Sequence, residues 1–164
     1  YANIYFSCTI YWILPWIIIL YFVERISPYQ PMLILLPYLI VWLCDSLAYF
    51  IGSKWGKHKM ISHISPKKTW EGTLGGMGIS ILIIPLILFK IIPNIQLHDA
   101  LAIGLFGCMA GISGDLVESM YKRAAGIKDS GSILPGHGGI LDRFDAYLFC
   151  APIVYLFLYW RGYI

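Results

Sequence analysis

Two carboxylates open the last apolar run of the chain, where Asp142 and Asp145 stand three residues apart with Arg143 between them. This spacing places both aspartates on one face of a helix start. Asp142 alone is consistent with an N-cap, because an aspartate at a helix start is ordinarily stabilising. A cap accounts for one carboxylate, but not for two beside an arginine and a glycine-rich loop. The pattern therefore favours a functional site.

The loop before these aspartates reads LPGHGG over residues 134–139. Its proline and glycines preclude a regular helix and let the backbone approach a bulky ligand closely. His137 lies between the glycines, next to Gly138 and Gly139. These residues predict a loop that can close around a ligand.

A second group of charges follows the fourth apolar run. Asp115, Glu118 and Lys122 are spaced at i, i+3 and i+7, so they share one face of a helix. A salt bridge explains Glu118 and Lys122 as a pair. The glycines that precede Asp115 recur at three- and four-residue steps, which is more typical of close helix packing in lipid than of a ligand site. Packing does not explain Asp115, which we take as a site residue.

The segment SPKKTWEG, residues 65–72, has the features of a phosphate-binding turn. Pro66 fixes the turn before Lys67 and Lys68, Thr69 can cap the helix that follows, and backbone N–H groups at a helix start can meet an anion. It is not a Walker A loop, because GxxxxGK is absent. Ser65 is the first residue of this segment, and we include it among the candidate site residues.

Asp45 lies inside an apolar run, where a charged side chain is costly and usually faces a partner, an ion or a water-filled cavity. The alternative is that Asp45, which is close to the end of the run, reaches the membrane interface. Both explanations stay open at this point.

The elements that position these residues must be membrane helices. The chain of 164 residues is 59% hydrophobic and only 13% charged, with a mean hydropathy of +0.71, which indicates a membrane protein. A membrane helix needs about 20 mostly apolar residues. Five runs come near that length, at residues 1–22, 31–51, 73–92, 100–117 and 144–160. We therefore predict an all-α, polytopic membrane protein of about five transmembrane helices, forming one integral-membrane domain over residues 1–164.

The cysteines each lie in a different apolar run, without a CxxC pair or zinc-like spacing. We expect neither disulfides nor a thiolate metal site.

The order of the runs places the polar connectors 52–72 and 118–143 on the same side of the membrane. Most of the basic residues belong to these connectors, so the positive-inside rule makes this side cytoplasmic. Few hard oxygen ligands suit Mg²⁺, which is usually bound by one or two carboxylates together with substrate phosphates. Lysine and arginine suit phosphate oxygens. The residues predict a membrane-embedded site for a phosphate-rich ligand with bound magnesium.

The polar segments also resemble a known family. The motifs Ser119–Arg123, Lys128–Gly131 and Leu134–Asp145 are similar to the full signature of the phosphatidate cytidylyltransferases, also called CDP-diglyceride synthases. Upstream, Asp45-Ser46, the 65–72 segment and Gly114-Asp115 resemble other segments of that family. The resemblance covers roughly residue 37 to the end. Family members are typically longer, with further spans before this part, so we expect this chain to be the C-terminal, catalytic portion.

The resemblance implies transfer of CMP from CTP to phosphatidic acid, which gives CDP-diacylglycerol and pyrophosphate. It implies a one- or two-cation site of Mg²⁺ held by Asp115, Asp142 and Asp145. The catalytic residues that it implies are Asp115, Lys122, Arg123, Lys128, His137 and Arg143. The substrate-binding residues that it implies are Ser65, Lys67, Lys68, Thr69, Gly138 and Gly139. The partners would be CTP, phosphatidic acid and the lipid bilayer of an inner or plasma membrane, with no nucleic acid, and glycine-rich helix faces allow a homodimer.

Two other functions stay open. One is another enzyme of related fold, either a CTP-dependent lipid kinase or a cytidylyltransferase for an archaeal ether lipid. The other is a non-enzymatic membrane protein such as a transporter. Transporters place polar residues near the bilayer midplane in several spans, whereas here they cluster toward one side.

Overall fold

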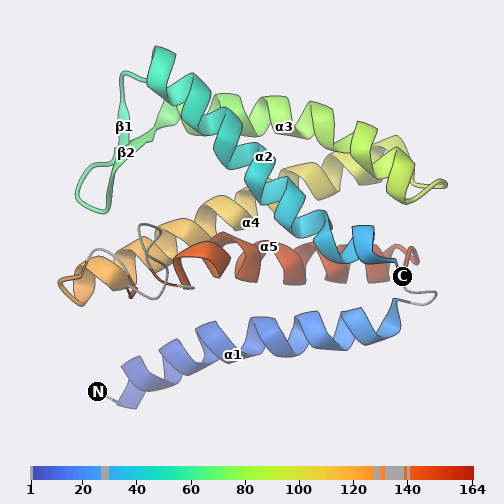
Figure 1. The fold of residues 1–164 in the computed structure, drawn as a ribbon, viewed down its shortest axis with the longest axis horizontal. Coiled ribbons are helices and arrows are strands. Elements are labelled where there is room, and N and C mark those ends of the chain that lie inside the picture. Colours follow the sequence, from blue (N-terminus) through green and yellow to red (C-terminus); the bar gives the residue numbers. More distant parts are fainter. Residues whose placement is uncertain (1, 27–29, 128–129, 132–138, 140) are drawn as a thin grey trace.

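The computed structural model describes residues 2–26, 30–127, 130–131, 139 and 141–164, with side chains described for these residues except 2–11 and 141. The regular elements, in chain order, are α1 (Ala2–Arg25), α2 (Pro31–Trp55), β1 (Lys59–Ile61), β2 (Ser65–Thr69), α3 (Trp70–Ile91), α4 (Leu97–Ala124) and α5 (Leu141–Trp160). Figure 1 shows the helices side by side along one long direction, with the short hairpin of β1 and β2 at one end.

The helices confirm the predicted all-α, polytopic membrane fold. Among the described residues, α2, α3 and α4 are each long and apolar enough to cross a membrane. Large apolar side chains such as Trp42 on α2 and Leu82 on α3 are exposed on the protein surface, as expected for helices that face lipid. The spans predicted at residues 1–22 and 144–160 coincide with α1 and α5, and their crossing of the membrane stays a prediction.

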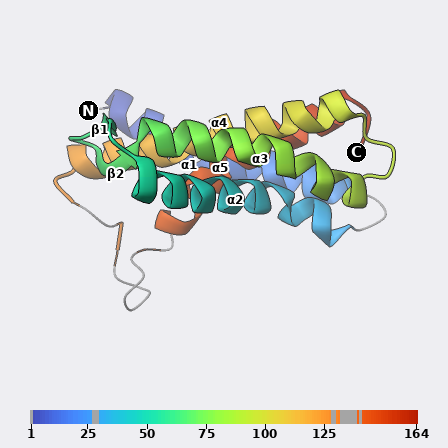
Figure 2. The ribbon, with the colours of Figure 1, turned by 90° about the horizontal axis from the view of Figure 1, so that it is seen from above.

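The helices pack as neighbours in a bundle, with α2 against α3, α3 against α4, and α4 against α5. Figure 2 gives the same bundle seen from above. Helix α1 packs against α5. The centroid of the Phe22 ring lies 5.6 Å from the ring centroid of Tyr159 and 6.2 Å from that of Tyr155. The Tyr155 hydroxyl donates a hydrogen bond of 2.9 Å to the Ile34 carbonyl and so joins α5 to α2.

The cysteines at 44, 108 and 150 are free and buried, as predicted. The side chain of Cys8 lies outside the part of the chain that the structure describes.

The glycine stripe of α4 lets the neighbouring helices approach closely, as the sequence predicts. A Cβ atom at Gly107 would lie 3.1 Å from Ile40 of α2 and 3.4 Å from Val154 of α5. At Gly114 a Cβ atom would lie 2.7 Å from the backbone oxygen of Asp145. Because glycine has no Cβ atom, the polar end of α4 can contact the first turns of α5 at this position.

The hairpin lies within residues 52–72, which were predicted to form a polar connector. Strands β1 and β2 are antiparallel, with Lys59 opposite Thr69 and Ile61 opposite Ser65. As predicted, Thr69 caps α3, because its hydroxyl accepts a hydrogen bond of 3.2 Å from the Gly72 N–H.

The start of α3 differs from the expected anion site. The Trp70 N–H donates to the His58 carbonyl at 3.0 Å, and the Gly72 N–H is bound by Thr69. Both backbone donors are therefore already used. The Glu71 carboxylate also turns back to the hairpin and accepts hydrogen bonds from the backbone N–H groups of Lys57 and His58.

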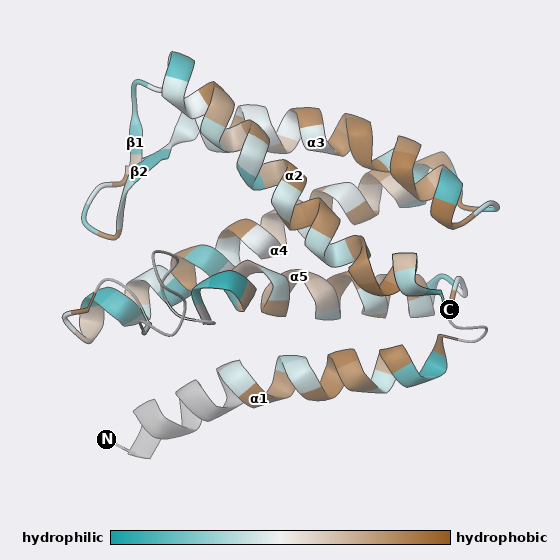
Figure 3. Cartoon of the chain, in the orientation of Figure 1, coloured by the Kyte–Doolittle hydropathy of each residue, from teal (hydrophilic) through white to brown (hydrophobic). Residues whose placement is uncertain are grey.

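Both polar segments lie at one end of the bundle, as their order in the chain predicts. Figure 3 shows hydrophilic residues on the hairpin, on the last turns of α4 and on the start of α5, all at the same end. The Arg123 guanidinium of α4 donates to the Ile64 carbonyl in the hairpin loop at 3.3 Å. At the opposite end, the buried Asp99 pairs with Arg161 at 2.8 Å and accepts from the Tyr163 hydroxyl at 2.7 Å.

The close crossing of α2 and α3, which holds the hairpin in place, gives a first prediction. A Cβ atom at Gly76 would lie 2.5 Å from the backbone nitrogen of Ala48, whereas one at Gly78 would meet nothing within 4 Å. We expect Gly76→Ala to destabilise the protein by about 1–3 kcal/mol through overpacking. Gly78→Ala is expected to be neutral or slightly stabilising, because alanine favours a helix more than glycine does. Thermal unfolding of both variants in detergent is the measurement, and equal midpoints would contradict the predicted tight crossing.

Candidate active site

Three carboxylates meet where the end of α4 crosses the start of α5. Asp115 and Glu118 come from α4 and Asp145 comes from α5, and one oxygen atom of each lies within 4.8 Å of the others. The close approach at Gly114 brings these helices together. The grouping brings together Asp115 and Asp145, two of the three predicted metal ligands, and it adds Glu118. Their binding of a cation stays a prediction.

Glu118 is the most buried member of this cluster, with a side chain only 1% exposed. Its Oε2 atom accepts a hydrogen bond of 2.8 Å from Lys122 Nζ. Its Oε1 atom is buried and has no hydrogen-bond partner among the residues that the structure describes. A buried carboxylate oxygen without a partner is costly. Three converging carboxylates with one such oxygen therefore fit a hard divalent cation such as Mg²⁺.

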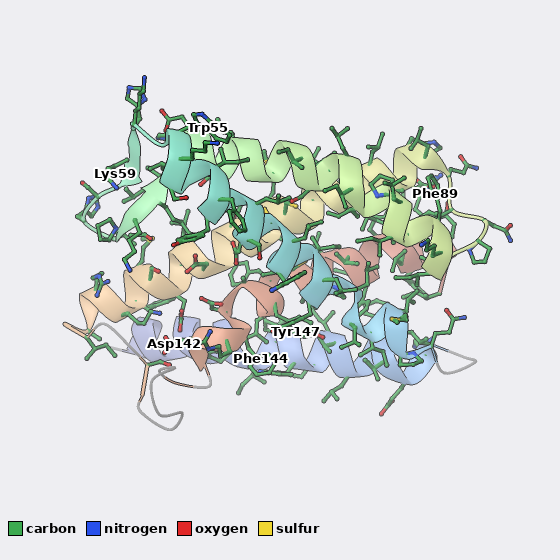
Figure 4. The ribbon with its side chains drawn as sticks, turned by 45° about the horizontal axis from the view of Figure 1, so that its top comes forward. Trp55, Lys59, Phe89, Asp142, Phe144 and Tyr147 are labelled. Carbon is green, nitrogen blue, oxygen red and sulfur yellow. The ribbon has the colours of Figure 1, made fainter. Side chains whose placement is uncertain are left out.

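Lys122 joins the carboxylate cluster to Asp142, whose Oδ1 atom lies 2.8 Å from the lysine Nζ. Asp142 also accepts hydrogen bonds from the backbone N–H groups of Gly139, at 2.8 Å, and Ser130, at 3.0 Å. Both backbone donors precede α5 in the chain, so these bonds tie the preceding loop to the helix and are not those of an N-cap. Figure 4 shows Asp142 at the polar end of the bundle. Asp142 is thus held by a lysine and two amides, while Asp145 lies with the carboxylates.

A cavity of about 630 Å³ lies beside the cluster, between α2, the hairpin and α4. Its polar lining consists of Asp45, Tyr49, Ser53, Lys59, Lys67, Lys68, Thr69, Thr73 and Asp115. Asp115 belongs both to this lining and to the carboxylate cluster, so the two features form one site. Asp45 faces the cavity, which favours the first of its two explanations.

Lys68 connects the hairpin to the cluster through an ion pair with Asp115. The lysine side chain is 22% exposed and that of the aspartate is 27% exposed, so both remain in contact with solvent. Lys59 and Lys67 line the same cavity, and Figure 4 places Lys59 at the same end of the bundle as Asp142. The hairpin therefore carries ammonium groups to the cavity wall.

The charges of this set of side chains suit a cation with bound phosphates. When all four are ionised, Asp115, Glu118, Asp142 and Asp145 carry four negative charges, and Lys68 and Lys122, which pair with them, carry two positive charges. The balance of two negative charges matches one divalent cation. Lys59 and Lys67, which line the cavity, can then bind phosphate oxygens.

Three further predicted site residues, Arg123, Arg143 and Ser65, belong to the described part of the chain. Arg123 donates to the backbone oxygens of Ile64 and Ile127, which links α4 to the hairpin loop. Arg143 is exposed in the first turn of α5, and Ser65 pairs with Ile61 in the hairpin. The other three predictions, Lys128, His137 and Gly138, lie outside the described residues.

Sequence reasoning missed Glu118 and Lys59 as parts of the site. Glu118 was explained by its salt bridge with Lys122, which the structure confirms at 2.8 Å. The i, i+3 spacing from Asp115 was the signal that placed both carboxylates on one face. Lys59 carried no comparable signal, because its position depends on the hairpin, which the sequence does not predict.

Comparison with known proteins adds independent information. The model of a family described as "Cytidylyltransferase family" matches residues 1–160. A phosphatidate cytidylyltransferase of Staphylococcus saprophyticus is 51% identical over 126 residues, which are 76% of this chain and 48% of that protein. Proteins of the same name from Staphylococcus aureus and Staphylococcus epidermidis are 47% and 48% identical over the same shares of the two chains. The chain thus spans about half the length of the curated relatives it matches.

Proposed function

The chain belongs to the cytidylyltransferase family, and on this premise we propose that it forms the catalytic part of a phosphatidate cytidylyltransferase. The proposed reaction transfers CMP from CTP to phosphatidic acid and gives CDP-diacylglycerol and pyrophosphate. The observation that carries the proposal is the cluster of Asp115, Glu118 and Asp145 beside a cavity lined by three lysines. The names of the relatives support the choice of substrates.

The proposed chemistry needs alignment and charge neutralisation more than a strong base. A phosphate oxygen of phosphatidic acid forms a bond to the α-phosphorus of CTP, while the bond between this phosphorus and the bridging oxygen of pyrophosphate breaks. The attacking oxygen is already ionised, so no group has to remove a proton from it. Positioning and electrostatic stabilisation supply most of the catalysis in such transfers.

The described side chains divide these tasks. Asp115, Glu118 and Asp145 would hold the cation, which supplies positive charge to the phosphates when it is bound. Lys59, Lys67 and Lys68 would bind phosphate oxygens from the hairpin side of the cavity. Lys122 would hold Glu118 and Asp142 in place, since it contacts both at 2.8 Å.

We infer that the site faces the cytoplasm of an inner or plasma membrane. Hydrophilic residues gather at the end of the bundle that carries the hairpin and the start of α5 (Figure 3). Most of the basic residues belong to the segments 52–72 and 118–143, and the positive-inside rule assigns such segments to the cytoplasm. CTP is then available on the side where the cavity lies. A homodimer stays a prediction of the sequence analysis.

The reaction can be tested by the position of a label in the nucleotide. Membranes that contain the protein are given phosphatidic acid with CTP labelled at either the α- or the γ-phosphorus. We expect label to enter lipid from the α position only, and to require a divalent cation. Transfer from the γ position would instead identify a CTP-dependent lipid kinase. Membranes with the Asp145→Asn variant serve as the control for background activity.

A further inference from the structure

We propose that Lys68 is an exchangeable partner of Asp115, which moves to a substrate phosphate when a cation takes the aspartate. The cation and the nucleotide would thereby bind cooperatively. This inference rests on the proposed function, because it concerns the same cation and the same phosphates. It assigns to Lys68 a role that differs from that of the neighbouring lysines.

The first step of the argument is that Lys68 and a cation would compete for one carboxylate. Asp115 lies within the three-carboxylate cluster, and its Oδ2 atom pairs with Lys68 Nζ. The buried Oε1 atom of Glu118, which has no hydrogen-bond partner among the described residues, independently indicates a ligand at this cluster. A cation bound there neutralises Asp115 and weakens its attraction for the ammonium group of Lys68.

The second step is that Lys122 and Lys68, the two lysines that pair with carboxylates of the cluster and with Asp142, are held very differently. Lys122 contacts both Glu118 and Asp142, and its side chain is 15% exposed beside a glutamate that is 1% exposed. Breaking such a buried pair is costly. Lys68 has one carboxylate partner in the described site, and both side chains of that pair are about one quarter exposed. Because this pair is more exposed than the pair of Lys122 with Glu118, Lys68 can leave Asp115 at a smaller cost than Lys122 can leave its partners.

The third step is that Lys68, once released from Asp115, can contact a phosphate bound in the cavity. Its side chain lines the same cavity as Lys59 and Lys67, which is where phosphates would be bound. While it pairs with Asp115, its charge is neutralised and attracts an anion weakly. Once the cation is bound, the ammonium group becomes available to a phosphate oxygen. Each ligand then favours the other, as linkage requires of any such coupling.

Direct binding of Mn²⁺ without substrates tests this exchange. The purified protein is titrated with Mn²⁺, and unbound Mn²⁺ is measured by electron paramagnetic resonance. We expect Lys68→Met to bind Mn²⁺ about three- to tenfold more tightly than wild type, because the competing ammonium group is removed. Its CTP binding in the presence of Mn²⁺ should nevertheless be weaker than that of wild type.

Lys67→Met is the matched control, because it removes one positive charge from the adjacent residue, which lines the same cavity. It should leave Mn²⁺ affinity close to that of wild type. Lys68→Gln and a thermal unfolding curve for each variant exclude misfolding as the cause. Equal Mn²⁺ affinities for the two methionine variants, or weaker Mn²⁺ binding by Lys68→Met, would overturn the exchange. Such a result together with intact transfer of α-label would leave the proposed reaction standing.

Discussion

Asp145→Asn is expected to lower the rate of CMP transfer about a hundred- to a thousandfold, the scale of losing one electrostatic contact to a transition state. The asparagine keeps the shape of the side chain and one oxygen atom, but it removes a negative charge from the cluster with Asp115 and Glu118. The variant should also bind Mn²⁺ much more weakly in the absence of substrates. Initial rates with α-labelled CTP and titration with Mn²⁺ provide the two measurements.

Asp142→Asn is the matched control, since it makes the same substitution one helical turn earlier. Asp142 is bound by Lys122 and by the backbone N–H groups of Ser130 and Gly139. Its loss should therefore lower the thermal midpoint and loosen the preceding loop, while Mn²⁺ affinity changes only a few-fold. If Asp142→Asn abolished Mn²⁺ binding and Asp145→Asn preserved it, the two aspartates would have the opposite roles.

The helices could be predicted from the sequence because lipid imposes a simple requirement on them. Runs of about 20 apolar residues mark their positions, and the helices α2, α3 and α4 confirm these runs. Their ends were less predictable. Helix α4 continues past the apolar run to Ala124, because the backbone hydrogen bonds of a helix form with charged residues as well as with apolar ones. Lys122, which was predicted to share a helix face with Asp115 and Glu118, lies on this helix, and so does Arg123.

The hairpin could not be predicted, because its stability depends on contacts that are distant in the chain. Strand β1 has three residues and β2 has five, one of which is Pro66. Neither shows an alternating pattern long enough to indicate a strand. The hairpin is held by Glu71, which accepts from two backbone N–H groups before β1, and by Arg123 from α4.

The site was predictable in part, for a reason of geometry. The chain order places both polar connectors on one side of the membrane, and this brings Asp115 and Asp145 together. The pairing of Lys68 with Asp115 follows from the same arrangement, but only the folded hairpin shows it. The salt bridge with Lys122 explains only one of the two oxygen atoms of Glu118. The other oxygen is buried and has no hydrogen-bond partner among the described residues, which the sequence could not show.

Glu118→Gln should separate these two functions of Glu118. A glutamine can still accept a hydrogen bond from Lys122, and Lys122 keeps its contact with Asp142. Without a divalent cation, we therefore expect a thermal midpoint equal to or above that of wild type, because one of three mutually repelling carboxylates is neutralised. With Mg²⁺ at about a hundred times its dissociation constant, wild type should gain about 2.7 kcal/mol, which is roughly 5 °C or more in midpoint. The variant should gain little, and its CMP transfer should fall steeply.

Glu71→Gln is the control for this pair of measurements, since it makes the same chemical change in a carboxylate that binds hairpin N–H groups and His58. It should lower the midpoint to some extent but preserve the gain on addition of Mg²⁺. A full gain in Glu118→Gln would show that Glu118 does not bind the cation. A collapse of its midpoint without Mg²⁺ would show instead that the charge of Glu118 serves to hold Lys122. An unchanged or higher midpoint that no longer responds to Mg²⁺ is the pattern expected if Glu118 helps to bind the cation.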